Sequence, residues 1–313
     1  MLMKPTGMID LHCDTLIYDP RPADGLAAAE PQLSLKKMPK GTKWAQFFAV
    51  FIKDHLRGQP AEDWFDTYAD YFDAEMKRWA DLVAPCRSFA DVGRAFDSGK
   101  FAAVLTVEGA AALGGRFERV QHLYDRGVRA MTLTWNGANE VCSGHDTDIG
   151  ITEFGRRVIP EMERLGMIVD TSHLNDRGFA ELCEIAEKPF IASHSNLRSI
   201  CGHKRNLPET HFKEFVRING LVGLNYYQLF VRDDGCFESF EDLFRHVYRM
   251  LELGGEDVIC LGSDYDGADI PDILNSVEKS LAVYEAFIKL GLSEAIADKI
   301  MFGNAYQFFS RNL

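Results

Sequence analysis

Residues 167–194 read MIVDTSHLNDRGFAELCEIAEKPFIASH. Two apolar segments, 167–171 and 189–193, flank a helical pattern at 176–187, and a histidine stands at the end of each apolar segment. An apolar strand, a helix and a second apolar strand are typical of a βαβ unit, in which the two strands run parallel. The pattern therefore predicts that His173 and His194 lie at the same edge of a parallel sheet.

The same alternation of strand and helix runs along the whole chain. Strands are expected at 8–13, 46–52, 101–107, 128–134, 167–171, 189–193, 221–225 and 258–263. Helices are expected at 61–82, 117–126, 152–165, 176–187, 209–219, 239–253, 273–290 and 293–309. Eight such repeats favour an α/β fold, a closed (β/α)8 TIM barrel, over an open doubly wound sheet. We expect one domain over 1–313, with long loops at 19–43 and 135–150 at the catalytic end.

Composition excludes several classes of protein. The net charge of −13 opposes binding to nucleic acid, which requires clustered lysine and arginine. No apolar stretch is long enough to span a membrane. Seven cysteines without a C-x-x-C pair, and an N-terminus unlike a secretion signal, indicate a reduced, cytoplasmic protein.

Residues that can bind or serve a metal ion stand at the ends of several predicted strands. They are His12, Asp14, Glu108, His173, His194, Asp264 and Asp266. In a parallel barrel the C-terminal ends of the strands surround one mouth, where catalytic residues gather. His12 and Asp14 would share one face of a strand, and Cys13 between them would face the other way and pack.

Two of these assignments have plainer alternatives. His12 could be a buried structural histidine beside a capping aspartate. A carboxylate at the end of a buried strand must be paired, hydrogen-bonded or metal-bound, so Glu108 could instead form a salt bridge with Arg116 or Arg129. The matched positions of the two later histidines favour the metal site.

Three imidazoles and two carboxylates exceed what one tetrahedral zinc ion binds. They suit two divalent ions that share a bridging carboxylate and hold a water between them, which would supply hydroxide at neutral pH. Asp264 is then the predicted proton shuttle, which takes the proton of the hydroxide and passes it to a departing amine. Asp266 is expected either to bind metal or to brace its loop.

These residues lie in five motifs. In chain order they are Ile9-Asp10-Leu11-His12-Cys13-Asp14, Val107-Glu108-Gly109, Asp170-Thr171-Ser172-His173-Leu174, Ile191-Ala192-Ser193-His194-Ser195 leading into Lys204-Arg205-Asn206-Leu207-Pro208, and Leu261-Gly262-Ser263-Asp264-Tyr265-Asp266-Gly267. Together they resemble the membrane dipeptidase (renal dipeptidase) family, peptidase family M19. The resemblance runs from Met8 to about Phe309 and is closest to the soluble bacterial branch.

The resemblance implies an amidohydrolase-like barrel and a role for each matching residue. The implied zinc ligands are His12, Asp14 and Glu108 for one ion and Glu108, His173 and His194 for the other. Glu108 would bridge the two Zn²⁺ ions, Arg205 would bind the terminal carboxylate of the substrate, and Asp264 would handle the proton. The implied reaction is the hydrolysis of dipeptides, including those with a D-residue on the carboxyl side. A homodimer is also implied.

Two positions depart from the family pattern. Trp135 stands where the best-known members carry a histidine that contacts the substrate, and indole can donate a hydrogen bond but cannot carry a proton. Trp135 could be a pocket wall, with Asn136 or Asn139 replacing the lost substrate contact. Phe230 stands near the place of a tyrosine that helps to bind the carboxylate.

These departures keep two other functions open. One is a related metal-dependent amidohydrolase that acts on a lactone, an N-acyl amino acid or a cyclic amide. The other is a protein that binds ligands in the same pocket without turnover. Neither departure removes a metal ligand, so the zinc dipeptidase is the leading hypothesis.

Overall fold

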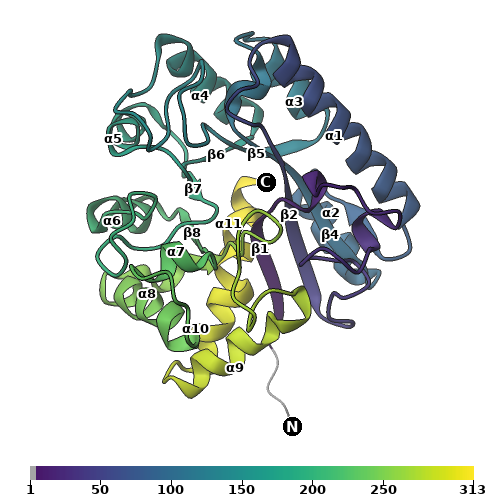
Figure 1. Ribbon diagram of the computed structural model, residues 1–313, viewed down its shortest axis with the longest axis vertical. Helices are drawn as coiled ribbons and strands as arrows, with labels where there is room; N and C mark the ends of the chain where they lie inside the picture. The colour runs from purple at the N-terminus through teal and green to yellow at the C-terminus, as the bar shows by residue number, and fades with distance from the viewer. Residues whose placement is uncertain (1–4) are drawn as a thin grey trace.

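Eight parallel strands close into a barrel in the computed structural model, which describes residues 5–313 (Figure 1). The strands of the ring are β1 (Gly7–Cys13), β2 (Lys43–Phe51), β4 (Phe101–Glu108), β5 (Val128–Thr132), β6 (Ile168–Asp170), β7 (Ile191–Ala192), β8 (Leu221–Leu224) and β9 (Ile259–Leu261). β1 lies between β2 and β9, and the pairing of β2 with β4 closes the ring. The predicted barrel and its eight strands are confirmed.

Helices surround the strands in chain order, as the colour gradient of Figure 1 shows. They are α1 (Gln59–Arg78), α2 (Phe89–Asp97), α3 (Arg119–Asp125), α4 (Glu153–Leu165), α5 (Asp176–Ile185), α6 (Glu209–Ile218), α7 (Gln228–Val231), α8 (Phe240–Glu252), α9 (Leu281–Lys289), α10 (Glu294–Asp298) and α11 (Asn304–Asn312). Helices such as α4 are amphipathic and bury one face, here Val158, Ile159 and Met162. Within residues 5–313, every helix is too short or too polar to span a bilayer.

Apolar side chains fill the interior of the barrel. Alternate residues of the strands, such as Ile9 and Leu11 of β1 and Ala45 and Phe47 of β2, belong to one buried cluster. α11 completes this cluster: the rings of Phe47 and Phe309 lie 4.7 Å apart between centroids. Asn304 ties the start of α11 to the carbonyl of Ile259, the first residue of β9, at 2.8 Å. The N-terminal end of the barrel is therefore plugged, and the opposite end is left for polar side chains.

Segment 83–100 contains two elements that sequence patterns did not predict. β3 (Val83–Pro85) pairs with the first residues of β4, and its three residues are too few to show an alternating pattern. α2 follows at Phe89, where the hydroxyl of Ser88 accepts a hydrogen bond from the backbone N–H of Asp91. This N-cap is the local signal that the pattern analysis overlooked.

The expected helices at 273–290 and 293–309 are partly wrong. In the first, only α9 is an α-helix, because the backbone N–H of Val277 bonds to the carbonyl of Gln32 in the long 19–43 loop (2.9 Å). In the second, a π-helical turn (Lys299–Gly303) separates α10 from α11. This wide turn buries Ile300, Met301 and Phe302 in succession, which one face of a regular α-helix could not do.

Local signals mark the ends of α4 and α5. Asn175 caps α5, and its side chain accepts a hydrogen bond from the N–H of Gly178 at 2.7 Å. Asp176, the first residue of α5, pairs with Arg198. Gly166 ends α4 in the left-handed conformation (φ 84°), as expected for a glycine after a helix.

Gly223 in β8 offers a test of how tightly the strands pack. A Cβ atom at this position would lie 2.0 Å from the carbonyl oxygen of Ser193. We expect Gly223→Ala to lower the free energy of unfolding by about 1–3 kcal/mol, because the neighbouring strands must move apart. Gly93→Ala in α2 is the control, since its Cβ meets nothing within 4 Å. Urea unfolding followed by circular dichroism measures both, and an unaltered Gly223→Ala variant would contradict the packing argument.

Candidate metal centre

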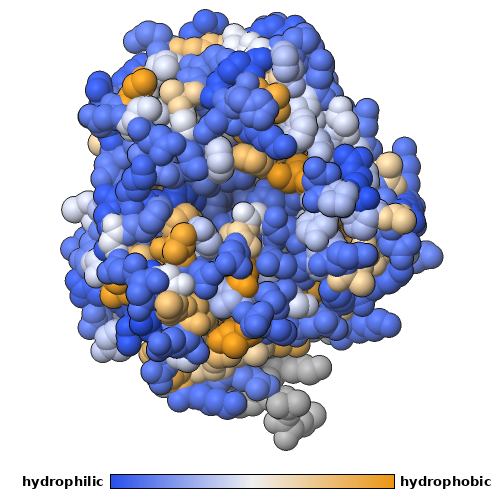
Figure 2. All heavy atoms as spheres, viewed as in Figure 1, coloured by the Kyte–Doolittle hydropathy of each residue, from blue (hydrophilic) through white to orange (hydrophobic). Residues whose placement is uncertain are grey.

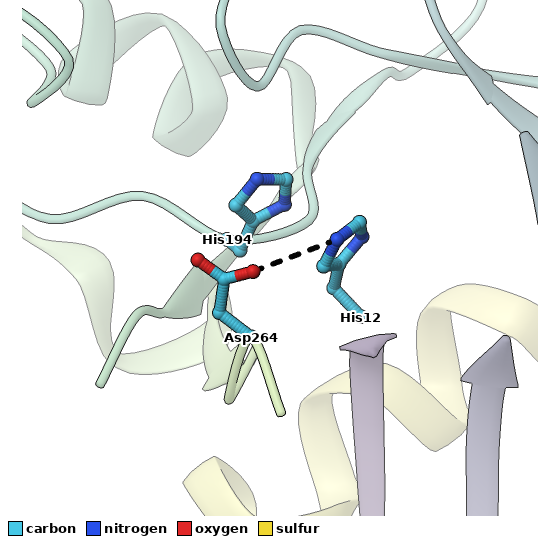
Figure 3. Close-up of side chains that lie close together, drawn as sticks. All are labelled: His12, His194 and Asp264. Atoms are coloured by element: carbon cyan, nitrogen blue, oxygen red, sulfur yellow. Dashed lines mark ion pairs between the residues drawn. The ribbon is translucent and has the colours of Figure 1, made fainter. Parts of the chain in front are cut away.

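The C-terminal ends of β1, β4, β6, β7 and β9 bring six polar side chains together. In chain order they are His12, Asp14, Glu108, His173, His194 and Asp264, all buried. Figure 3 shows three of them, with His12 beyond the tip of β1 and His194 and Asp264 pointing toward the same space. Sequence positions more than 250 residues apart thus converge at one mouth, as a parallel barrel allows.

Glu108 lies between two groups of possible ligands. Its Oε2 is 3.7 Å from Nε2 of His12, which is itself 3.3 Å from Oδ2 of Asp14. Its Oε1 is 2.7 Å from Nε2 of His173 and 3.5 Å from Nε2 of His194. Each group of three offers ligand atoms within 4.8 Å of one another, and Glu108 belongs to both. One carboxylate oxygen therefore faces each of two adjacent sites.

Asp264 lies on the open side of these two groups. Its Oδ1 is 3.7 Å from Nε2 of His12, the contact drawn as a dashed line in Figure 3. Its Oδ2 accepts a hydrogen bond from the side-chain amide of Asn225, just after β8, at 3.0 Å. Asp264 also forms a possible ligand group with His12 and His194. One oxygen is thus held by the protein and the other faces the site.

Neighbouring side chains fix the histidine rings. Nδ1 of His173 lies 3.0 Å from Oδ1 of Asn136, and Nδ1 of His194 lies 2.8 Å from Oγ of Ser193. The Nε2 atoms of both rings therefore face Glu108 and each other, 3.0 Å apart. Partners on the second ring nitrogen are what set the orientation of metal-binding histidines.

The backbone at the mouth is strained. His173, Asp264 and Asp266 have left-handed backbone, with φ of 73°, 66° and 65°. Such values are uncommon for residues other than glycine and cost of the order of 1–3 kcal/mol each. Position 267 requires glycine for a different reason, since a Cβ there would lie 2.0 Å from Oδ2 of Asp14. The turn after β9 therefore packs closely against the candidate ligands.

The charges at the site call for a cation. Burial raises the pKa of Glu108, and the charge of Asp14 raises it further; burial also raises the pKa of Asp264. Burial alone would lower the pKa of His12, but the charges of Glu108 and Asp14 outweigh it and raise this pKa to about 10. Among residues 5–313, the buried Oδ1 of Asp14 has no hydrogen-bond partner. Clustered carboxylates, an unpartnered oxygen and converging imidazoles form a donor set that fits divalent cations.

The two arginines considered as partners of Glu108 bind elsewhere. Arg116 pairs with Glu62, and Arg129 bonds to backbone carbonyls, so neither forms the salt bridge. Cys13 packs in the core and donates to the carbonyl of Phe47 (3.4 Å), as expected for a residue that faces away from the site. The plainer role for Glu108 is therefore wrong, and the packing role for Cys13 is confirmed.

Asp266 braces the loop rather than joining the candidate ligands. Its carboxylate accepts hydrogen bonds from the hydroxyl of Thr15 (2.6 Å) and from the backbone N–H groups of Gln32 (2.7 Å) and Leu33 (3.3 Å). It thereby ties the 19–43 loop to the turn after β9. Burial raises its pKa to about 6 despite these bonds.

A cavity of about 600 Å³ opens onto the site. Figure 2 shows the hollow near the middle of this face, with mostly hydrophilic residues inside it and hydrophobic residues at its edge. Trp135 lines the cavity as a wall: its ring packs edge-on against Phe51 at 4.7 Å and lies 6.3 Å from that of His173. Asn136 also lines it, although its observed contact is with His173.

Arg205 lies buried behind this cavity. Its guanidinium donates to Oγ of Ser195 (3.2 Å) and to the carbonyl of His194 (3.1 Å), and it stacks over Phe230 at 5.5 Å. Its Nε has no partner among residues 5–313, and burial lowers its pKa to about 10. A buried cation therefore stands directly beside the candidate ligands.

Two cavity residues were missed by sequence reasoning. His145 comes from the 135–150 loop and His203 from the segment that precedes Arg205. Neither ends a strand, so the pattern that identified the other histidines could not detect them. For His145 the signal was the length of the 135–150 loop, which indicated function without naming a residue, and His203 had no such signal.

Comparison with known proteins shows which family this chain resembles. The family model described as membrane dipeptidase (peptidase family M19) matches residues 1–311. The chain belongs to peptidase family M19. An uncharacterised protein in the pqqA 5′ region of Klebsiella pneumoniae is 32% identical over 230 residues, which are 70% of this chain and 85% of that protein. The predicted family is confirmed, and with it a metallopeptidase.

Solved structures agree with this M19 assignment. The metallopeptidase named dipeptidase AC, of family M19, is 27% identical with a TM-score of 0.92 over 99% of both chains. A metallopeptidase from Rhodobacter sphaeroides, bound to a phosphinate mimic of the dipeptide L-Ala-D-Ala, is 26% identical with a TM-score of 0.92 over 99% of this chain and 100% of that one. An amidohydrolase from Pseudomonas aeruginosa, 21% identical with a TM-score of 0.83 over 98% of this chain and 96% of that one, shares the fold. All three structures thus share the barrel of this chain.

The position of Glu108 between two ligand groups predicts how metal content should respond to mutation. We expect Glu108→Gln to bind less metal than the wild type, because a neutral amide cannot balance the charge of a cation. Asp266→Asn is the control, since this carboxylate braces the loop and should leave the metal content unchanged. Metal analysis of protein loaded with zinc and then desalted measures both. Full occupancy in Glu108→Gln would contradict the bridging position.

Metal binding should also depend on pH. His12 is protonated below a pKa of about 10 in the metal-free protein, and a metal ion needs the neutral ring. We therefore expect affinity to fall as pH is lowered and protons to be released on binding. Calorimetric titration with zinc in two buffers of different ionisation enthalpy measures the number of protons released. Equal heats in both buffers would contradict this prediction.

Proposed function

We propose that this M19 protein is a dipeptidase with two zinc ions. His12, Asp14 and Glu108 would hold one ion, and Glu108, His173 and His194 the other. The single observation that carries this proposal is that the two oxygens of Glu108 face different ligand groups. Imidazole and carboxylate are suitable ligands for zinc, and a shared carboxylate is typical of paired metal sites.

A dipeptide is the substrate that the charges of the cavity favour. Arg205 would bind the terminal carboxylate, a role for which its planar fork of N–H donors is suited and for which its unpartnered Nε is available. The cavity is also lined by Asp264, Asp266 and Asp269, toward which a free amino group would point. The relative from Rhodobacter sphaeroides binds a mimic of L-Ala-D-Ala, so a D-residue on the carboxyl side is part of this proposal.

Asp264 is the proposed proton shuttle. Bound zinc ions would polarise the scissile carbonyl and lower the pKa of a water molecule. Oδ1 of Asp264 would accept the proton of the attacking water while Asn225 holds Oδ2. As the C–N bond breaks, the same oxygen would return the proton to the departing nitrogen, so that an amino acid with a neutral amine leaves.

The other hypotheses are weaker for specific reasons. Trp135 is the main argument for a lactone, an N-acyl amino acid or a cyclic amide as substrate. Its ring packs against Phe51 and forms a wall of the cavity, so it does not by itself indicate a different substrate. Binding without turnover has no support from the site, since Asp264 and all five proposed ligands converge. The homodimer stays a prediction.

The first test is metal-dependent hydrolysis. We expect protein stripped with a chelator to cleave no dipeptide and zinc to restore cleavage, measured by release of amino acids from a panel of L,L- and L,D-dipeptides. Cleavage that persists in verified metal-free protein would contradict the proposal. Binding of dipeptides by the zinc-loaded protein without any product would instead support the non-catalytic alternative.

The second test concerns Asp264. We expect Asp264→Asn to lower kcat by at least about a hundredfold, the usual contribution of a positioned acid–base group. The bound metal should remain, because Asp264 is not among the five proposed ligands. Asp234→Asn, on the surface near Arg232, is the matched control and should keep kcat. A normal kcat in Asp264→Asn with full metal content would rule out the shuttle.

A further inference from the structure

The basic side of the cavity holds more groups than one carboxylate requires. His145 and His203 line it, Arg205 is buried close by, and the exposed Lys204 adjoins both His203 and Arg205 in the chain. Lys204 is already paired with Asp146 at 3.1 Å, which joins the 135–150 loop to the segment before α6. If Arg205 binds the terminal carboxylate, no group of the substrate is yet assigned to the two histidines.

The two histidines form one surface. Their ring centroids lie 6.3 Å apart in an edge-to-face arrangement, although they come from different loops. The ring of His145 lies 6.3 Å from that of His173 and nearly parallel to it, so His145 stands beside the proposed metal site. His203 packs on Phe230 at 4.7 Å, the same ring over which Arg205 stacks.

Each histidine has a ring nitrogen available to a ligand. Nδ1 of His145 is buried and has no hydrogen-bond partner among residues 5–313. Nδ1 of His203 accepts a hydrogen bond from the backbone N–H of Arg205 at 3.1 Å. In a neutral ring the proton of His203 is therefore on Nε2, where it can be donated. A buried, unpartnered nitrogen in a polar cavity is costly unless a ligand or water satisfies it.

Building on the proposed dipeptidase activity, we propose that His145 and His203 form a second anion-binding subsite beside Arg205. It would bind the side-chain carboxylate of an aspartate or glutamate at the C-terminal position of the dipeptide. Such a residue carries two carboxylates a few bonds apart. Arg205 lies buried beside the site, and the cavity surface next to it offers the Nε2–H of His203 and the unpartnered Nδ1 of His145. Lys204 balances Asp146, whose carboxylate lies 3.7 Å from Nε2 of His145, and the buried positive charge of Arg205 then favours an anion over a neutral side chain.

Two conservative variants test the subsite. His145→Phe keeps a ring beside His173 but removes its nitrogens, and His203→Asn keeps an acceptor near Nδ1 but removes the Nε2 donor. Zinc-loaded enzyme would be assayed on alanyl-aspartate, alanyl-asparagine and alanyl-leucine, with L and D forms of the second residue. We expect the wild type to prefer aspartate at least about tenfold in kcat/KM over both others, and each variant to lose most of that preference through KM. His55→Phe, an exposed histidine outside the cavity, should keep it.

The outcomes separate this subsite from the dipeptidase proposal. Cleavage of all three dipeptides with no preference for aspartate, or a preference that survives both variants, overturns the subsite and leaves the dipeptidase standing. If no dipeptide is cleaved, the dipeptidase proposal fails and calorimetric binding of free aspartate and leucine decides the subsite. Aspartate that binds at least tenfold tighter than leucine, and loses this advantage in His203→Asn, supports it; equal binding overturns it.

Discussion

The burial of Glu108 is the constraint on which the site depends. Its carboxylate ends β4 inside a mouth that also encloses Asp14 and Asp264, and burial makes each negative charge costly there. His12 can carry one compensating proton, since its pKa is raised to about 10. On the other side of Glu108 burial lowers the pKa of His173 and His194, so neither supplies charge. Cations on both sides would satisfy the carboxylates and use the imidazoles in their neutral form.

Buried aspartates hold the turns that carry the candidate ligands. Asp10 accepts hydrogen bonds from the backbone N–H and hydroxyl of Ser263, one residue before Asp264. Asp170 accepts the same pair from Ser193, one residue before His194. The same pair of aspartate–serine hydrogen bonds thus joins β1 to the end of β9 and β6 to the end of β7. These bonds fix the backbone just below the mouth. They thereby hold residues such as Asp264 in a strained conformation that they would not keep alone.

Sequence predicted the barrel and the convergence because both follow from strand periodicity. Parallel strands of a barrel must end at one mouth, so His12, Glu108 and His194 could be grouped from the order of strands and helices alone. The periodicity could not locate His145 or His203, since the path of a long loop depends on distant contacts. Hydrogen bonds from the N–H of Gly137 to Asp54 and from Arg57 to the carbonyl of Ala138 hold this loop, and no local pattern encodes them.

The strands of the barrel and the loops contribute different residues to the site. Strand ends place the candidate ligands with little freedom, because a shift of one residue would turn each side chain to the other face. Among the loop residues, Trp135 lies beside His173 without bonding to it, whereas Asn136 fixes the ring of that ligand. Loop side chains such as Trp135 can therefore alter the choice of substrate without a new metal site. In the proposed dipeptidase, the acidic residues of the cavity and Arg205 would orient a zwitterion, and His145 and His203 would select the anions that it can carry.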